Sequence, residues 1–324
     1  MKYAKAIRGG VQIPLIVYAL LGLVGPTFAV ESRAPAPNTT LQKVSVGNLT
    51  RTYYFHVPPA LSRSRLLPLV LAFHGGGGTP AIIERESKFS DLADREGFLV
   101  AYPEGIHKTW NDGRGVKAIA AQKDNVDDIG FITALINDVA RLHKVDRKRI
   151  FATGISNGGI FSHYLAANLS PQIAAIAPVA GGLSESLRDK FNPEKPVSVL
   201  IFHGTQDPMV PYNGGGITVL GAKRGRIIGT EDAARKWAIH NGCARDPVVT
   251  DLENKDPNDG CTVKKFLYQK GTDGTEVMLY RIEGGGHTWP DGLQYLPEMV
   301  IGKVCRDING AAIMWEFFKN HPKP

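Results

Sequence analysis

The sequence contains one G-x-S-x-G motif whose serine, Ser156, could act as a nucleophile. An apolar run at 150–153 precedes the motif, and helical spacing begins near Asn157. A strand that turns through this motif into a helix is typical of a nucleophile elbow, because the tight turn needs glycines and lifts the serine hydroxyl above the sheet. The helix amino terminus favours developing negative charge beside it. We predict that Ser156 is a nucleophile; a Gly/Ser turn without chemistry is the alternative.

A serine nucleophile needs a histidine to accept its proton and a carboxylate to orient that histidine. Asp207 follows the apolar run 197–202, and His287 follows the run 277–282 on a glycine-rich loop. Any single histidine is more typical of a surface or packed residue. The order serine, acid, histidine, with each residue just past a predicted strand, favours a catalytic triad of Ser156, Asp207 and His287.

Four consecutive glycines at 75–78 follow the apolar run 69–73. Backbone N–H groups at this position stabilise the oxyanion of an acyl-transfer reaction. We therefore predict an oxyanion hole formed by the N–H groups of Gly76 and Asn157. A phosphate-binding loop is the alternative, but no Lys-Ser/Thr pair follows the glycines and no long helix is expected to begin there.

Elements that could position these residues alternate along the chain, in the pattern of a mostly parallel sheet covered by helices. The predicted buried strands are 69–73, 98–102, 150–153, 173–179, 197–202 and 277–282. The predicted helices are 128–143, 230–240 and 307–319, the first capped by Asp127 or Asp128. Residues 42–57 alternate and predict an antiparallel opening pair. The predicted fold class is α/β, with a single domain over 41–324.

The composition excludes several classes of protein. The chain has 324 residues, of which 43% are hydrophobic and 21% charged. This is enough apolar material for a large core, so a disordered, collagen-like or coiled-coil protein is excluded. The formal net charge is +7, but Lys2, Lys5 and Arg8 account for three of these charges and the rest are evenly spread. Nucleic acid is therefore not an expected partner.

The amino terminus has the features of a targeting segment. Residues 1–29 have a basic start, an apolar stretch at 11–24 and small residues before Val30, which predicts a cleaved signal peptide. A retained membrane anchor is the alternative, but the stretch is short and interrupted by Gln12 and Pro14. Residues 30–40 are expected to be an exposed lead-in. The mature protein is expected to be secreted or periplasmic, without a stable membrane anchor.

The chain has three cysteines and no Cys/His cluster at metal-ligand spacing, so no metal is expected. Cys243 and Cys261 flank a polar loop, and export would place them in an oxidising compartment. We predict a disulfide between them, which would restrict the unfolded chain. Cys305 is then left as a buried, unreactive thiol.

From about Leu41 onward the chain resembles secreted α/β-hydrolase esterases of the polyhydroxybutyrate depolymerase-like family, close to the feruloyl and acetylxylan esterases of carbohydrate esterase family 1. The matching strings are Ala72–Gly78, Tyr102–Gly105, Trp110–Gly113, Val126–Phe131, Gly154–Gly159, His203–Asp207 and Gly284–Pro290. The resemblance implies an α/β-hydrolase fold and the same triad. It implies no cofactor.

Three aromatic residues near these strings are predicted to line the substrate pocket: Trp110, Tyr212 and Trp289. Packing beneath the loops is the alternative for all three. Asp127 and Asp128 are predicted to be a helix cap and a loop brace, because adjacent residues at a helix start point in different directions and do not suit glycosidase chemistry.

The expected function is therefore a serine ester hydrolase that works through an acyl-enzyme. Hydroxyalkanoate esters of the polyhydroxybutyrate type, as oligomers or polymer, are the first expectation. Feruloyl or acetylxylan esters of plant cell walls are the second. A secreted serine peptidase of the same fold and a non-catalytic carbohydrate-binding protein are further alternatives.

Overall fold

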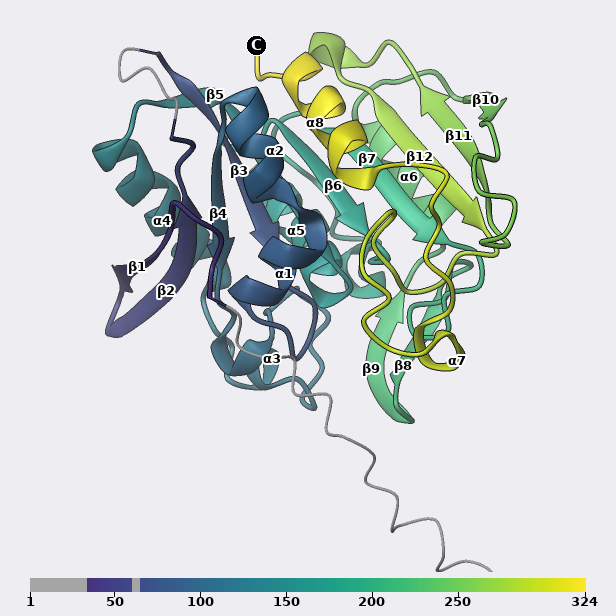
Figure 1. The fold of residues 1–324 in the computed structure, drawn as a ribbon, viewed down its shortest axis with the longest axis horizontal. Helices are drawn as coiled ribbons and strands as arrows, with labels where there is room; N and C mark the ends of the chain where they lie inside the picture. The colour runs from purple at the N-terminus through teal and green to yellow at the C-terminus, as the bar shows by residue number, and fades with distance from the viewer. Residues whose placement is uncertain (1–33, 60–64) are drawn as a thin grey trace, which may run out of the picture. The chain divides into compact units, whose positions relative to one another are not determined.

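The computed structural model of the chain describes residues 34–59 and 65–324, and the predicted signal peptide lies outside them. The body of the molecule is one ten-stranded sheet (Figure 1). From edge to edge its strands are β1 (Thr39–Val46), β2 (Leu49–His56), β4 (Leu99–Pro103), β3 (Leu67–Phe73), β5 (Val145–Ile155), β6 (Ala175–Val179), β7 (Ser198–Gly204), β12 (Val277–Glu283), β11 (Thr262–Tyr268) and β10 (Val248–Asp251). A separate hairpin consists of β8 (Gly215–Val219) and β9 (Ala222–Ile227).

The six central strands, from β4 to β12, pair in parallel, and the strands at both edges pair antiparallel. Parallel strands place their carboxyl ends at one edge of the sheet. The loops that follow β3, β5, β7 and β12 therefore meet at that edge, where crevices between loops form ligand sites in open α/β sheets.

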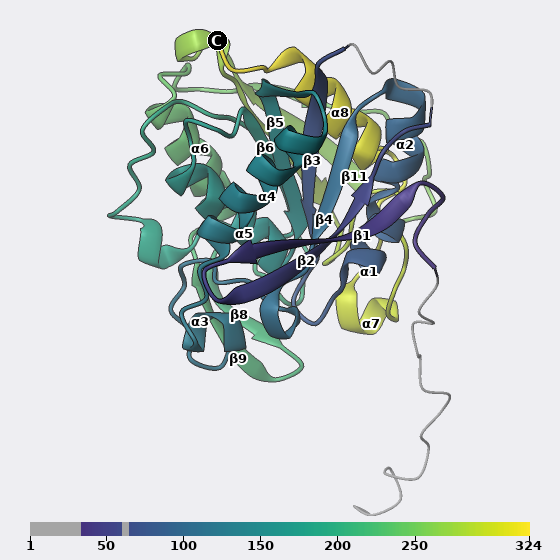
Figure 2. The same ribbon diagram turned by 90° about the vertical axis from the view of Figure 1, so that its left-hand side faces the viewer.

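Helices cover both faces of the sheet (Figure 2). One face carries α4 (Asp128–Leu142), α5 (Asn157–Asn168) and α6 (Thr230–His240); the other carries α1 (Pro80–Ser87), α2 (Phe89–Glu96) and α8 (Gly310–Asn320). Two short helices, α3 (Ala120–Lys123) and α7 (Glu298–Ile301), lie in connecting loops. Alternate residues of the central strands pack into two cores, one under each helical layer, which explains the uninterrupted apolar runs in the sequence.

The predicted α/β class is confirmed, and each predicted strand and helix is present with shifts of a few residues at its ends. Prediction missed α1 and α2, because both are short and rich in charged residues and the chain breaks between them at Lys88, whose φ is 56°. It also missed β10, which is only four residues long and exposed, and β11, whose apolar run is interrupted by Lys264 and Lys265.

The predicted disulfide between Cys243 and Cys261 is wrong. Cys243 packs against the core under α4, α5 and α6, whereas Cys261 belongs to the core on the other face of the sheet. All three cysteines are thiols in the structure. The two cysteines are close along the chain, but the fold places them on opposite faces of the sheet.

None of the helices within residues 34–59 and 65–324 is long and apolar enough to cross a membrane.

Candidate active site

Ser156 sits at the sharp turn between β5 and α5, with φ 58° and ψ −121°. A positive φ is strained for a residue with a side chain, and such strain concentrates at functional positions. Two glycines permit the turn. A Cβ atom on Gly154 would lie 2.6 Å from the carbonyl oxygen of Phe73, and one on Gly158 would overlap the same oxygen. The predicted elbow is therefore present.

The glycine loop after β3 lies directly against this elbow. A Cβ atom built on Gly75 would be 3.4 Å from Ser156 Cβ, and one built on Gly76 would be 3.8 Å from Asn157 Cβ. Within the described part of the chain, the N–H groups of Gly76 and Asn157 form no hydrogen bond. Two unused donors thus flank the serine, as an oxyanion hole requires.

His74 fixes the shape of this loop. Its Nε2 accepts the N–H of Gly105 at 3.0 Å, so its Nδ1 carries the proton and donates to the carbonyl oxygen of Gly75 at 2.8 Å. Burial lowers the pKa of His74 to about 4, and the ring is neutral at pH 7. The neutral imidazole, with a hydrogen bond at each of its two nitrogens, holds the Gly75 peptide in one orientation.

Asp207 and His287 form the second part of the site. His287 Nδ1 donates to Asp207 Oδ2 at 2.7 Å, although the residues are 80 positions apart. Asp207 Oδ1 accepts the N–H groups of Met209 and Val210, both at 2.8 Å. Because Nδ1 of His287 holds the proton, its Nε2 is left with a lone pair, which is what a general base needs.

The structure does not join the two parts by a hydrogen bond. Among the described residues, the Ser156 hydroxyl has no hydrogen bond to His287, and β5 and β12 are separated by β6 and β7. Both residues follow the carboxyl ends of parallel strands at the same edge of the sheet. In unliganded enzymes the catalytic hydrogen bonds are often long and shorten when substrate binds.

The loop that carries His287 is clamped by its neighbours. The N–H of His287 donates to the carbonyl oxygen of Ile301 at 2.5 Å, and its own carbonyl accepts the hydroxyl of Tyr295 at 3.0 Å. A side chain at Gly286 would overlap the backbone of Ile301 and Gly302. The glycines before His287 are therefore needed for close backbone packing.

Charges around the pair set its protonation. Burial by itself lowers the pKa of His287, but the charge and hydrogen bond of Asp207, and the charge of Glu86, outweigh it and raise that pKa above the ordinary value. Burial likewise raises the pKa of Asp207, but His287 and His203 overcome this and hold it well below its usual range. Asp207 is therefore ionised at every pH at which His287 titrates.

A second buried histidine, His203, braces the acid. Its Nε2 donates to the carbonyl oxygen of Val210 at 2.9 Å and lies 3.4 Å from Asp207 Oδ2. Its Nδ1 receives the hydroxyl of Thr230 at 2.6 Å. His203 thus fixes the loop that presents Asp207.

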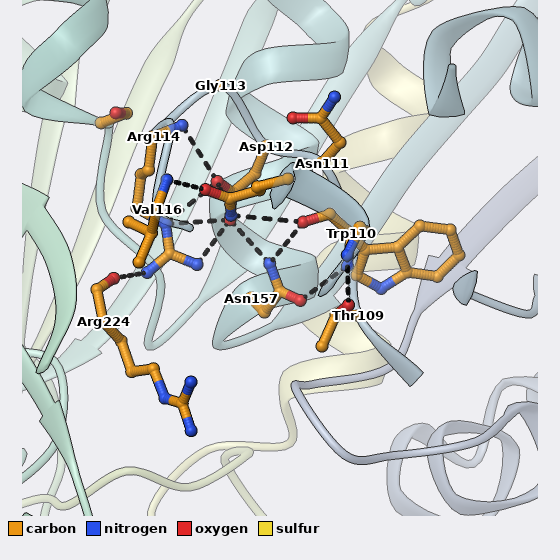
Figure 3. A network of polar contacts seen from close by, with 12 residues as sticks. Thr109, Trp110, Asn111, Asp112, Gly113, Arg114, Val116, Asn157 and Arg224 are labelled. Carbon is orange, nitrogen blue, oxygen red and sulfur yellow. Dashed lines mark hydrogen bonds and ion pairs between the residues drawn. The ribbon is translucent and has the colours of Figure 1, made fainter. Parts of the chain in front are cut away.

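A buried polar network stands behind Asn157, the predicted oxyanion donor (Figure 3). The Asn157 side chain accepts the N–H of Trp110 at 2.8 Å and donates to Asp112 Oδ2 at 2.6 Å. Asp112 is fully buried and also binds the Arg114 guanidinium and the Gln122 amide. Arg114 in turn donates to the carbonyl oxygen of Arg224 in β9 at 2.6 Å.

The paired aspartates have the predicted structural roles. Asp127 caps α4 by accepting the N–H of Gly130 at 2.7 Å. Asp128 is buried, pairs with Arg51 at 2.8 Å and accepts the N–H of Asn111 at 2.8 Å. Asp128 therefore holds the loop that leads to Asp112.

The prediction that Trp110, Tyr212 and Trp289 line the substrate pocket does not agree with their burial. Trp110 is 0% exposed, Trp289 is 1% exposed and Tyr212 is 6% exposed. Trp110 stacks on Phe161 and donates its indole N–H to the carbonyl oxygen of His74 at 2.9 Å.

Each of the other two aromatic residues also lies beneath a loop of the site. Tyr212 packs edge-on against His203 and donates its hydroxyl to Glu231 at 3.0 Å. Trp289 packs edge-on against Phe89, inside the core under α1, α2 and α8. Large rings fill the space under loops that lack secondary structure, so these residues support the site from behind.

Sequence reasoning missed several contributors. His74 and Asp112 lie inside strings that carried the family resemblance, and that position was the available signal. No signal in the sequence pointed to Glu86, because it stands in a charged stretch that resembles a solvated helix face. It is nevertheless only 5% exposed, and its Oε1 has no hydrogen-bond partner among the described residues.

Comparisons with known proteins agree with this geometry. Residues 51–186 match the family described as Esterase PHB depolymerase. Over these residues the chain is similar to that esterase family. The match contains the glycine loop, the Trp110–Asp112 loop and Ser156, whereas Asp207 and His287 lie beyond it.

Two relatives of this chain are named as esterases. Feruloyl esterase B of Piromyces equi is 32% identical over 241 residues, which cover 72% of this chain and 42% of that protein. This chain thus spans less than half of that relative's length. The bifunctional acetylxylan esterase/xylanase XynS20E of Neocallimastix patriciarum is 30% identical over 45% of this chain and 20% of its own length.

The acetyl xylan esterase from Aspergillus awamori shares the fold, with a TM-score of 0.55 over 87% of this chain and 99% of that one, at 17% identity. The fold is therefore the α/β-hydrolase fold, as the sequence predicted.

Proposed function

We propose that this chain is a carboxylic ester hydrolase that uses Ser156, His287 and Asp207 as a catalytic triad. Ser156 Oγ attacks the ester carbonyl carbon while its proton passes to His287 Nε2. The N–H groups of Gly76 and Asn157 stabilise the oxyanion. The alcohol leaves with the proton from His287, and a water activated by the same nitrogen then releases the acid from the acyl-enzyme.

One observation carries this proposal: the Gly75–Gly76 backbone lies against Ser156 and Asn157, and the N–H groups of Gly76 and Asn157 are unused. A glycine loop with a purely structural role would have its N–H groups paired, as those of Gly77 and Gly78 are. The ordered Asp207–His287 pair at the same edge of the sheet supplies the matching base.

The proposed substrate is a hydroxyalkanoate ester of the polyhydroxybutyrate type, as an oligomer or polymer. The family of residues 51–186 supports this class by its description. Feruloyl or acetylxylan esters are the second candidate, supported by the relatives from Piromyces and Neocallimastix.

We also propose that residues 1–29 are a signal peptide, that 30–38 are an exposed lead-in and that one catalytic domain follows. The predicted boundary at residue 41 moves because β1 begins at Thr39, whose side chain is buried. The protein would then act outside the cytoplasm. The described part of that domain supports its unity, because one sheet runs through it from β1 to β12.

The test is hydrolysis of a panel of esters by purified protein: p-nitrophenyl butyrate, hydroxybutyrate oligomers, methyl ferulate and acetylated xylan. We expect turnover of at least one of them and a loss of about 10³-fold or more in kcat/KM for Ser156→Ala. The matched control is Ser45→Ala, an exposed serine on β1, which should retain full activity. Turnover that survives in Ser156→Ala, or no turnover of the panel, would contradict the proposal.

A further inference from the structure

Two cysteines that are distant in sequence meet in the core beneath the His287 loop. Cys261 precedes β11 and is 3% exposed, and Cys305 precedes α8 and is 1% exposed. Their Sγ atoms and a carboxylate oxygen of Asp259 all lie within 4.8 Å of one another. Cys243, the third thiol, lies on the other face of the sheet.

The carboxylate of Asp259 aligns the two segments that carry these thiols. Its Oδ1 accepts the N–H of Cys261 at 2.7 Å, and its Oδ2 accepts the N–H of Arg306 at 2.6 Å. Each carboxylate oxygen therefore binds a backbone N–H group, one at Cys261 and the other at the residue after Cys305. This use favours a bridge between the thiols over a metal site in which the carboxylate would be a ligand.

The two segments flank the exit of β12, which leads to His287. Thr262 pairs with Glu283 at the end of β12. On the other side, the carbonyl oxygen of Lys303 accepts the N–H of Gly286 at 2.9 Å, and the carbonyl oxygen of Cys305 accepts the N–H of Asp291 at 2.9 Å. A covalent link from Cys261 to Cys305 would therefore close a ring around the loop that carries the base.

We propose that Cys261 and Cys305 form a disulfide that fastens the segment 301–305 to the start of β11 and so secures the His287 loop. The oxidant is an external disulfide such as oxidised glutathione. A bond forms between the two Sγ atoms, and the two thiol hydrogens end on the two thiols released from the reagent. Two electrons leave the protein and reduce the reagent's S–S bond.

The timing of this step follows from the environment of the thiols. The hydrogen bond with Cys261, and then burial, raise the pKa of the Cys305 thiol far above its ordinary value. Since the thiolate is the reacting form, the packed thiols oxidise slowly. The bridge is expected to form while the chain folds, before this core closes.

The experiment refolds the full chain with a mixture of reduced and oxidised glutathione, blocks remaining thiols and maps peptides without reduction. We expect one peptide pair linked through Cys261 and Cys305, with Cys243 alkylated. Reduction of the refolded protein should lower Tm by about 5–10 °C. Cys243→Ser is the matched control, and it should show the same link and the same loss.

The double variant Cys261→Ala/Cys305→Ala should have a Tm that reductant does not change. If that variant fails to fold, the peptide map and the reductant dependence of the unsubstituted chain still decide the question. Three alkylated cysteines after oxidative refolding would overturn the proposal, as would a link through Cys243. So would one tightly bound zinc ion per chain whose removal by a chelator exposes both thiols.

Discussion

The amide group of Asn157 is locked to the carboxylate of Asp112, with Nδ2 and Oδ2 2.6 Å apart. Asn157 begins α5 and supplies, by its backbone N–H, one donor of the proposed oxyanion hole. Asp112 belongs to a loop 45 residues earlier, and Arg114 and Gln122 hold it in turn. The proposed donor next to Ser156 is thus positioned by a buried network of side chains behind it.

Replacing Asn157 by Ala keeps the backbone donor but removes this lock. We expect kcat to fall by about 10-fold, because the N–H loses its fixed direction, and stability to fall by about 1–3 kcal/mol, because Asp112 loses a buried partner. Kinetics on p-nitrophenyl butyrate and thermal unfolding would measure both. Asn168→Ala, an exposed asparagine at the other end of α5, is the matched control and should change neither.

Asp207→Asn should lower kcat/KM by about 10⁴-fold. The amide cannot stabilise a charged His287, and it disfavours the tautomer that leaves Nε2 unprotonated. Asp232→Asn, an exposed aspartate on α6, controls for a general effect of charge. A loss of less than 10-fold would show that Asp207 is not the triad acid.

Activity should fall as the pH is lowered through the pKa of His287, because a protonated imidazole cannot accept the serine proton. Asp207 and Glu86 raise that pKa, so the loss should occur above the ordinary histidine value of about 6.5. Burial raises the pKa of Glu86 itself to about 7. Glu86 is therefore mainly charged above that pH, and it is there that its charge acts on His287.

Glu86→Gln removes the second charge and should shift the acidic limb of the kcat/KM profile to lower pH. Glu253→Gln, at an exposed position, should leave the profile in place. A limb that stays unmoved in Glu86→Gln would show that Glu86 does not act on His287.

Trp289→Ala tests whether this residue binds substrate or supports the loop. Removing a buried indole from the core should cost about 3–5 kcal/mol of stability. KM should change little at a temperature where the variant is folded. A large rise in KM with unchanged unfolding would instead restore the predicted role in substrate binding. Trp237→Ala, a core tryptophan in α6, is the control for loss of a buried ring.

The fold class, the elbow at Ser156 and the places of Asp207 and His287 after their strands were predictable because their signals are local. A strand buried on both faces must be apolar throughout, and a helix must repeat its apolar residues every three to four positions, so β3 to β7 and α4 were readable from single segments. The elbow is equally local, since Gly154 and Gly158 are required by backbone contacts around Ser156 itself.

Partners across the sheet were not predictable in this way. Asp112 and Asn157 are joined across 45 residues, and Cys261 meets Cys305 instead of Cys243 because strand order decides which face each cysteine enters. From the sequence, the three aromatic residues beside the site could equally have faced the substrate or the core. In the structure all three are buried under the loops.

By itself, then, the sequence determined the α/β architecture, the turn that carries Ser156 and the places of Asp207 and His287 just past their strands, since each follows from the periodicity or motif of a short stretch. The tertiary structure alone decided what surrounds them: the Asp112 network, the charge of Glu86 near His287 and the proximity of the Cys261 and Cys305 thiols. Such contacts depend on the order and direction of strands. Those are set by the packing of the whole sheet and cannot be recovered from residue spacing.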